Sequence, residues 1–382
     1  MKIIKIALLG LLASTLCGCS GFFDKDNTPD PSPLVNFRTE LNVQKLWRSS
    51  ATSGMGEDYL KLVPAVSPTA VFTAGSGGTV TATDRRTGRT IWSVDTKADI
   101  TSGPAANDGL VAVGTRKGQV IVLSQCDGKL LWQNCVSSEI LAPPAIGNGY
   151  IIVKTIDGKV TGFSEQTGNP VWHYEQTEPL LILRGASAPQ ISRNNVVVGF
   201  ANGNLARLSL RDGYSSWQQT VAIPDGSFAI QRMIDIDADP IIYNNKVYVG
   251  TYQGKVAALD FDSGRQRWSH DISTYSGIAA DYDRVYVSDG KGHVWAFEAG
   301  SGNVDWRQTQ LEARNISGPA VIGNYVVVGD QEGYLHFLCK QDGHFVARIK
   351  VDSSGIQAAP VVDNNVIYVV AKDGTLSAYT IG

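Results

Sequence analysis

The six residues 127–132, "DGKLLW", decide the fold because the chain repeats them with small changes. Related segments end in tryptophan at Trp92, Trp172, Trp217, Trp268 and Trp306. A glycine stands 14 residues before each of these tryptophans, and two further copies of the glycine step begin at Gly333 and Gly374. In all eight units a proline, or in one copy Ile278, stands another 14 residues upstream. Repeats of about 40 residues indicate a solenoid, an array or a propeller.

The pattern within each unit favours β-strands. Runs such as "VVVGD" (326–330) and "VYVGT" (247–251) are β-branched, and a glycine turn and a second run such as "KVAALD" (255–260) follow them. No amphipathic helical window competes with these runs, and 40 glycines supply many turns. We therefore predict an all-β fold, an eight-bladed β-propeller of four-stranded blades over residues 39–382.

The two ends of the repeat predict how the ring closes. The eighth unit stops at Gly382, before its fourth strand, while "NVQKLWRSS" (42–50) carries Trp47 without strands of its own before it. We expect this N-terminal strand to complete the last blade, which removes an exposed sheet edge. The repeated tryptophans, which the seventh unit replaces with Ala347, are expected to pack between blades, and Trp295 to lie in the core.

The N-terminus reads as an export signal. Lys2 and Lys5 precede an apolar stretch, 6–16, that is too short to span a bilayer and ends in "LCGC". This ending resembles the bacterial lipobox, so residues 1–18 are interpreted as a lipoprotein signal peptide and Cys19 as the lipid-modified residue. An ordinary signal peptide with an incidental cysteine is the alternative. Ser20 after the cysteine then implies the outer membrane, facing the periplasm, and residues 19–38, rich in Asp, Asn, Pro and Ser, are expected to form a lipidated flexible tether.

Composition and side-chain chemistry exclude several functions. The formal net charge is −3 and no long basic run occurs, so nucleic acid is not expected as a partner. Cys126 and Cys135 are predicted at opposite ends of a turn and strand, too far apart for a disulfide, and Cys339 is also expected to be free. The five histidines show no ligand spacing and no serine elbow is present. We expect neither a metal site, a cofactor nor catalytic residues.

The segments that link one blade to the next differ in length. The link from Trp172 to Pro189 spans 17 residues and that from Trp217 to Pro240 spans 23. The closing link from Trp47 to Pro64 also spans 17, and the other links from a repeat tryptophan span 10 to 13. All links should emerge on one face, and the links after Trp172 and Trp217 should lie side by side because they flank one blade. Their apolar and charged residues are typical of a protein interface, although capping of the central channel is the alternative. The residues are Leu181, Leu183, Arg184, Phe228, Ile230, Arg232, Met233, Asp235 and Asp237.

Four segments carry a resemblance to a known family. They are "LRGASAP" (183–189), "DIDADP" (235–240), "VVVGDQEGYLHF" (326–337) and "KVDSSGIQAAP" (350–360). On an eight-fold repeat with a lipobox, they resemble BamB, the lipoprotein family of the outer-membrane β-barrel assembly machinery. The resemblance implies a non-catalytic scaffold that binds the periplasmic POTRA domains of BamA and supports insertion of β-barrel proteins. The residues that it implies in this contact are Leu181, Leu183, Arg184, Asp235 and Asp237.

Three questions stay open at this stage. Arg184 can contact the partner directly or hold its own loop through Asp235 or Asp237. The repeat also resembles the quinoprotein dehydrogenases, enzymes that use pyrroloquinoline quinone and Ca²⁺, but the chain has no adjacent cysteine pair, and "DIDAD" (235–239) lacks the glycine and glutamate of a calcium loop. Unfolded outer-membrane proteins are a further possible partner, through strand addition to an exposed sheet edge.

Overall fold

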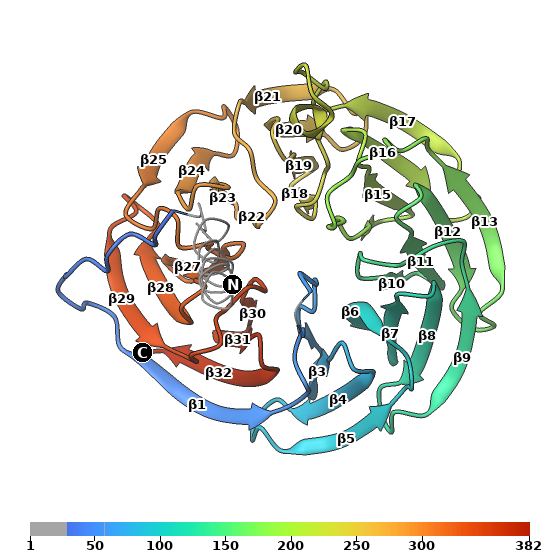
Figure 1. Ribbon diagram of the computed structural model, residues 1–382, viewed down its shortest axis with the longest axis horizontal. Coiled ribbons are helices and arrows are strands. Elements are labelled where there is room, and N and C mark those ends of the chain that lie inside the picture. Colours follow the sequence, from blue (N-terminus) through green and yellow to red (C-terminus); the bar gives the residue numbers. More distant parts are fainter. Residues whose placement is uncertain (1–28, 57) are drawn as a thin grey trace, which may run out of the picture.

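The computed structural model describes residues 29–56 and 58–382, and it confirms the predicted architecture. Eight four-stranded antiparallel sheets stand around a central axis as the blades of a propeller (Figure 1). The signal peptide expected at 1–18 and the lipidation expected at Cys19 lie outside the described residues. Among the residues described, no helix is long and apolar enough to cross a membrane.

The strands follow one another outward through each blade. The first four blades are β2 (Ala65–Val66), β3 (Ala70–Ala74), β4 (Thr79–Asp84), β5 (Thr90–Asp95); β6 (Ile100–Asn107), β7 (Leu110–Thr115), β8 (Gln119–Ser124), β9 (Leu130–Cys135); β10 (Ala145–Gly147), β11 (Tyr150–Lys154), β12 (Lys159–Ser164), β13 (Pro170–Glu175); and β14 (Gln190–Ser192), β15 (Asn195–Gly199), β16 (Asn204–Ser209), β17 (Ser215–Thr220). The last four are β18 (Ile241–Tyr243), β19 (Lys246–Gly250), β20 (Val256–Asp260), β21 (Gln266–His270); β22 (Gly277–Ala280), β23 (Arg284–Ser288), β24 (Val294–Glu298), β25 (Val304–Gln308); β26 (Ala320–Ile322), β27 (Tyr325–Gly329), β28 (Tyr334–Cys339), β29 (Phe345–Lys350); and β30 (Val361–Asp363), β31 (Val366–Val370), β32 (Thr375–Ile381), β1 (Val43–Ser50).

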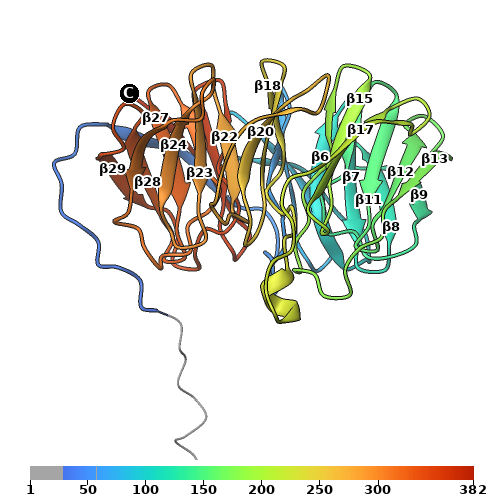
Figure 2. The same ribbon diagram turned by 90° about the horizontal axis from the view of Figure 1, so that it is seen from above.

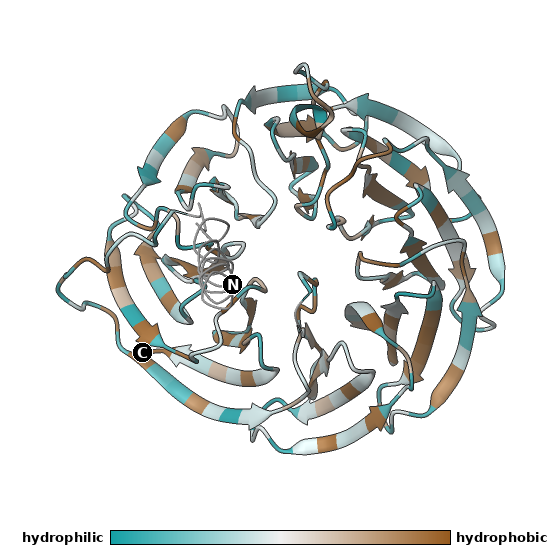
Figure 3. Cartoon of the chain, viewed as in Figure 1, coloured by the Kyte–Doolittle hydropathy of each residue, from teal (hydrophilic) through white to brown (hydrophobic). Residues whose placement is uncertain are grey.

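The core lies in the middle strands of the blades. These strands are buried almost throughout, while the outer strands alternate between exposed and half-buried residues. Figure 3 shows the same division, with hydrophobic colour concentrated on the middle strands. Side chains on the two faces of a blade pack against the next blade on each side, so each sheet is covered on both faces and apolar runs such as "VVV" are needed.

The ring closes as predicted. β1 pairs antiparallel with β32, and Trp47 stands opposite Ala378 in this pairing. The N-terminal strand therefore forms the outer strand of the eighth blade, and its pairing with β32, interrupted by one register shift between Lys45 and Trp47, holds the two ends of the described chain together.

The repeated tryptophans join neighbouring blades, which confirms their predicted role. The indole Nε1 of Trp172 donates to the carbonyl of Leu210 at 2.7 Å, and its ring lies against Gly213 of the next blade. A Cβ at Gly213, which has φ +70°, would come within 2.6 Å of that ring, so the turn requires glycine. The other six contacts of this kind are Trp47 with Gly88, Trp92 with Gly128, Trp132 with Gly168, Trp217 with Gly264, Trp268 with Gly302, and Trp306 with Gly343.

Ala347 stands where the seventh blade lacks its tryptophan, and the N-terminal segment explains the exchange. The next blade has no turn at this level, because its outer strand comes from the other end of the chain. Leu41 is buried in the same apolar cluster as Ala347, and the backbone N–H groups of Glu40 and Leu41 donate to the carbonyl of Val346 at 2.9 and 3.2 Å.

Residues 19–38 were expected to form a flexible tether, but the last residues of this segment, which the structure describes from residue 29 on, pack against the propeller. Arg348 donates to the carbonyl of Val35 at 3.0 Å, and Phe37 stacks on Phe345 with ring centroids 5.5 Å apart. Residues 35–37 therefore lie against the seventh blade, because two apolar side chains can be buried there. Ser32 is already held upstream of this contact, because Arg314 donates to its carbonyl at 2.7 Å, so any flexible tether must end before Ser32.

The structure also shows the state of the three cysteines after the N-terminal segment and the position of Trp295. Cys126, Cys135 and Cys339 are free, as expected. Trp295 is half-buried against an apolar cluster, and its Nε1 donates to Asp289 at 2.9 Å, so it belongs to the core.

Candidate partner-binding site

The two long links lie side by side, as the sequence predicted. We call residues 176–189, between β13 and β14, the first insertion, and residues 221–240, between β17 and β18, the second insertion. The backbone N–H of Leu183 in the first donates to Asp235 Oδ2 in the second. The insertions therefore meet on the same face of the ring and flank the fourth blade.

Both insertions expose large apolar side chains. Leu180 is fully exposed, and Leu181, Phe228, Ile230 and Ile223 keep between 45% and 78% of their surface accessible. We call these five residues the apolar patch. Exposed apolar residues gathered on projecting loops mark interaction sites more often than scattered ones do. Sequence reasoning missed Leu180 and Ile223, although Leu180 stood within the apolar run of the first insertion.

The second insertion projects furthest from the ring. It contains the 3-10 turn Ala229–Arg232, which has no buried residue and which Figure 2 shows as a coiled ribbon beyond one face of the disc. The side chain of Gln231 shapes this turn, because its Oε1 accepts the backbone N–H groups of Ser227 and Phe228 at 3.0 and 3.1 Å. Met233 was expected among the exposed anchors, but it is buried and begins the return of the chain into the core.

Asp235 and Asp237 lie beneath the first insertion and do not face solvent. Their side chains are almost completely buried, with residue exposures of 1% and 5%. Asp235 accepts the Leu183 N–H, and a Cβ at Gly185 would lie 2.8 Å from a carboxylate oxygen of Asp237. The two acids therefore position the first insertion from below, and any effect on a partner passes through this loop.

Burial controls the ionisation of the groups under the insertions. It raises the pKa of Asp235 to about 7, and it also raises the pKa of Asp237. Burial lowers the pKa of Lys154, whose Nζ donates to the carbonyl of Gly199 at 2.5 Å. A desolvated carboxyl keeps its proton to higher pH because the charged form has lost its hydration.

Lys61 joins both insertions, and sequence reasoning missed it. Its Nζ donates to the carbonyl of Ala186 in the first insertion at 3.2 Å and to the carbonyl of Asp237 in the second. It also pairs with Asp239 at 2.8 Å, and Asp239 in turn accepts the backbone N–H of Ala188 at 2.6 Å. Asp239 stood in the "DIDAD" segment, but no signal in the sequence pointed to a lysine from the link between β1 and β2.

Arg184 pairs with groups that the sequence did not suggest. Its Nη2 lies 2.8 Å from Glu139 Oε1 and 3.9 Å from Asp58 Oδ2, both on other links. The proposed bond from Arg184 to Asp235 or Asp237 is therefore wrong. Arg116 pairs with the same two acids, so Arg184 is held in a surface cluster of alternating charge while its side chain stays about half exposed.

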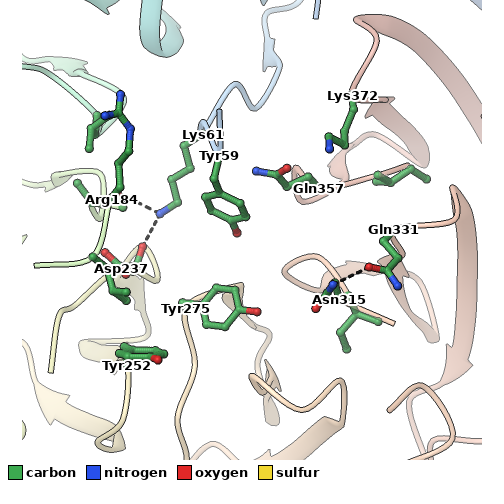
Figure 4. A pocket seen from close by; sticks show the side chains of 16 residues that line it. Tyr59, Lys61, Arg184, Asp237, Tyr252, Tyr275, Asn315, Gln331, Gln357 and Lys372 are labelled. Atoms are coloured by element: carbon green, nitrogen blue, oxygen red, sulfur yellow. Dashed lines mark hydrogen bonds between the residues drawn. The ribbon is translucent and has the colours of Figure 1, made fainter. Parts of the chain in front are cut away.

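The first insertion also borders the mouth of the central channel. A cavity of about 590 Å³ opens there, and Figure 4 shows Tyr59, Tyr252 and Tyr275 projecting into it, with Arg184 at its edge. Residues from seven of the eight blade-to-blade links contribute to the wall, which supports the prediction that all links share one face. Leu183 is half-buried in this wall. The first insertion was expected either to form a protein interface or to cap the central channel. The position of Leu183 fits capping of the channel, and the exposure of Leu181 fits an interface.

Comparisons with known proteins agree on one family. A family model described as outer membrane protein assembly factor BamB matches residues 76–308 and 296–382. The outer membrane protein assembly factor BamB of Pseudomonas aeruginosa is 45% identical over 377 residues, covering 99% of each chain. The crystal structure of BamB from Moraxella catarrhalis superposes with a TM-score of 0.79 at 26% identity, covering 90% of this chain and 99% of that one.

The enzymes considered as an alternative share only the fold. The quinohemoprotein alcohol dehydrogenase of Comamonas testosteroni has a TM-score of 0.70 but 14% identity, and the matched part is 76% of that chain. At this identity the likeness describes the propeller and says nothing of catalysis.

Proposed function

Because the chain belongs to the BamB family of outer membrane protein assembly factors, we propose that it is a non-catalytic scaffold of outer-membrane protein assembly that binds the periplasmic POTRA domains of BamA. The two insertions around the fourth blade would make this contact. The apolar patch would bury against the partner, and the half-exposed Arg184 would contact its polar rim.

The exposure of the apolar patch on well-positioned loops is the observation that supports this proposal. Leu181 and Phe228 expose 45% and 67% of their surface to water, which costs free energy that a partner would recover. The loops below them are held by Lys61, Asp235 and Asp239, so little ordering entropy would be lost on binding.

The expected anchor fits this role. With Cys19 lipidated and the signal peptide 1–18 removed, the propeller would stay at the periplasmic face of the outer membrane, tied by the residues before Ser32. The propeller would then share a membrane surface with BamA, and a surface-restricted partner needs only a modest intrinsic affinity.

The test is a binding titration of the purified lipoprotein with the POTRA domains of BamA. Leu181→Ala and Phe228→Ala should each weaken binding by roughly 30-fold, since a central anchor contributes about 2 kcal/mol. Arg184→Ala should weaken it less, because its charge is partly satisfied by Glu139.

Leu131→Ala is the matched control. Leu131 is 50% exposed on β9, an outer strand of the second blade. Its substitution by alanine removes the same atoms as Leu181→Ala, but from a surface outside the insertions. It should leave affinity unchanged. Equal affinity of wild type, Leu181→Ala and Phe228→Ala, with intact thermal unfolding, would exclude the insertions as the docking surface.

A further inference from the structure

The turn between β28 and β29 brings three different metal-binding side chains together. A sulfur of Cys339, a carboxylate oxygen of Asp342 and a ring nitrogen of His344 all lie within 4.8 Å of one another. No other such group of three occurs among residues 29–56 and 58–382. Searching the sequence for histidine spacing missed it, because only one of the three residues is a histidine.

The repeat itself shows that this turn is unusual. The same turn occurs in each of the first seven blades, and in six of them its first residue is Asp, Ser or Glu: Asp84, Ser124, Ser164, Ser209, Asp260 and Glu298. These oxygens accept hydrogen bonds within the turn, as Asp84 Oδ1 does from Thr87 N at 2.7 Å. Only the seventh blade has a thiol there, at Cys339, and only this blade has a histidine after the turn glycine. The backbone bonds of the turn, such as Cys339 N to His344 O at 2.9 Å, are retained, and Cys339 also packs against the apolar cluster of the seventh and eighth blades.

A fourth residue, from the other end of the chain, orients the histidine. His344 Nδ1 faces Asp342 Oδ1 at 2.6 Å, and its Nε2 faces Glu40 Oε2 at 3.3 Å. Histidines that bind a metal through one nitrogen generally donate the other N–H to a carboxylate, which fixes the tautomer and makes the ligating nitrogen more basic. Glu40 occupies this outer position.

We propose that Cys339, Asp342 and His344 form a zinc site, with Glu40 as the carboxylate that orients the imidazole. Thiolate, imidazole and carboxylate together suit Zn²⁺, whereas Ca²⁺ and Mg²⁺ prefer oxygen ligands alone. Ligands of tetrahedral zinc lie about 3.4 Å apart, so the three atoms need shifts of only about 1 Å, which an exposed turn allows. Water would fill the remaining position.

The site would fasten the seam of the ring. Glu40 precedes β1, whose pairing with β32 closes the propeller, and Gly343 within the turn receives the ring of Trp306. Metal bound to the turn would fix His344, and through it Glu40 and the chain that leads toward the expected lipid anchor. Binding would require loss of the thiol proton and a neutral imidazole.

Cobalt is the probe that reports thiolate ligation directly. The full chain, purified under reducing conditions and freed of metal by a chelator, is titrated with Co²⁺ while the sulfur-to-cobalt charge-transfer absorption is recorded, and Zn²⁺ is then added. We expect the charge-transfer band to appear when Co²⁺ is added to the wild type and to disappear when Zn²⁺ displaces the cobalt. Cys339→Ser should abolish the band, His344→Ala should weaken binding at least 10-fold, and Glu40→Gln should weaken it by about 10-fold or more.

Cys126→Ser provides the matched control. Cys126 is an exposed thiol in the corresponding turn of the second blade, where Lys129 takes the place of the histidine. This variant should bind cobalt like the wild type. Absence of the band in wild type, or an equal band in Cys339→Ser, overturns the site, and unchanged affinity in Glu40→Gln overturns the role given to Glu40. As a second readout, Zn²⁺ should raise the melting temperature of the wild type and not of Cys339→Ser.

Discussion

Two links that leave their blades at the same point of the repeat differ in burial. They are the link after Trp268, which packs against the ring, and the second insertion, which projects from it. The short link folds back at once: Thr274 is fully buried, and its hydroxyl donates to the carbonyl of Ser288 at 2.7 Å. The second insertion has enough chain to leave the ring, expose residues 223–232 and return at Met233. The residues of a link that is just long enough to join two blades are thus buried and hydrogen-bonded. The additional residues of the second insertion, 223–232, are exposed and free to contact a partner.

The largest expected effect tests the ring side of this comparison. Trp217→Ala removes an indole that packs on Gly264 and donates to Phe261 O at 2.9 Å. We expect the free energy of unfolding to drop by about 3–5 kcal/mol, because a large, partly buried side chain packed between two blades leaves a cavity and a carbonyl loses its donor. Urea denaturation followed by tryptophan fluorescence measures the change. A loss below about 1 kcal/mol would show that blade packing does not depend on these contacts.

The double variant Phe228→Ser with Ile230→Ser tests the insertion side. Both residues are exposed, so the free energy of unfolding should change by less than about 0.5 kcal/mol while affinity for the POTRA domains falls. The same urea titration checks stability. Strong destabilisation would mean that the second insertion is part of the fold and would remove the contrast.

The pH dependence of the free energy of unfolding tests the role of Asp235, which lies buried between the ring and the first insertion. The pKa of Asp235 is raised from 3.8 to about 7 in the folded chain, so the unfolded chain releases this proton at lower pH. The free energy of unfolding should therefore fall as the pH rises from 3.8 to about 7, by an amount on the order of 4 kcal/mol, and stay low above that. Asp235→Asn, which can still accept the Leu183 N–H, should lack this slope. An identical slope in both proteins would assign the pH dependence to other groups.

The smallest effect is expected at Arg184. Arg184 itself is about half exposed and Glu139 keeps a second partner in Arg116, so Arg184→Ala should lower the free energy of unfolding by less than about 1 kcal/mol, and 0.5 M salt should reduce this difference further. Thermal unfolding at two salt concentrations makes the comparison. A larger loss that salt does not alter would indicate a packing role for this side chain.

The sequence predicted the ring so well because its signals are local. A tryptophan and a glycine at constant spacing are required in every blade by the same contact, as between Trp172 and Gly213. The insertions could be located by counting residues, but not their internal bonds. Lys61 reaches Asp239 across 178 positions of the sequence, and Arg184 reaches Glu139 across 45.

The same limit explains the errors within the candidate site. Met233, Asp235 and Asp237 follow exposed residues in an apparently polar loop, and nothing in the local pattern shows where the chain turns back into the core. Burial of the two acids became visible only once the first insertion was placed above them. Cys339, Asp342 and His344 formed a group only when the seven turns were compared in three dimensions.

Amide hydrogen exchange of the protein with and without the POTRA domains of BamA tests the central claim most directly. The account predicts that BamA slows exchange in residues 177–188 and 221–234, while the outer strands β5 and β9 exchange as before. Slowed exchange confined to the outer strands or to the opposite face of the ring, with both insertions unchanged, would contradict it.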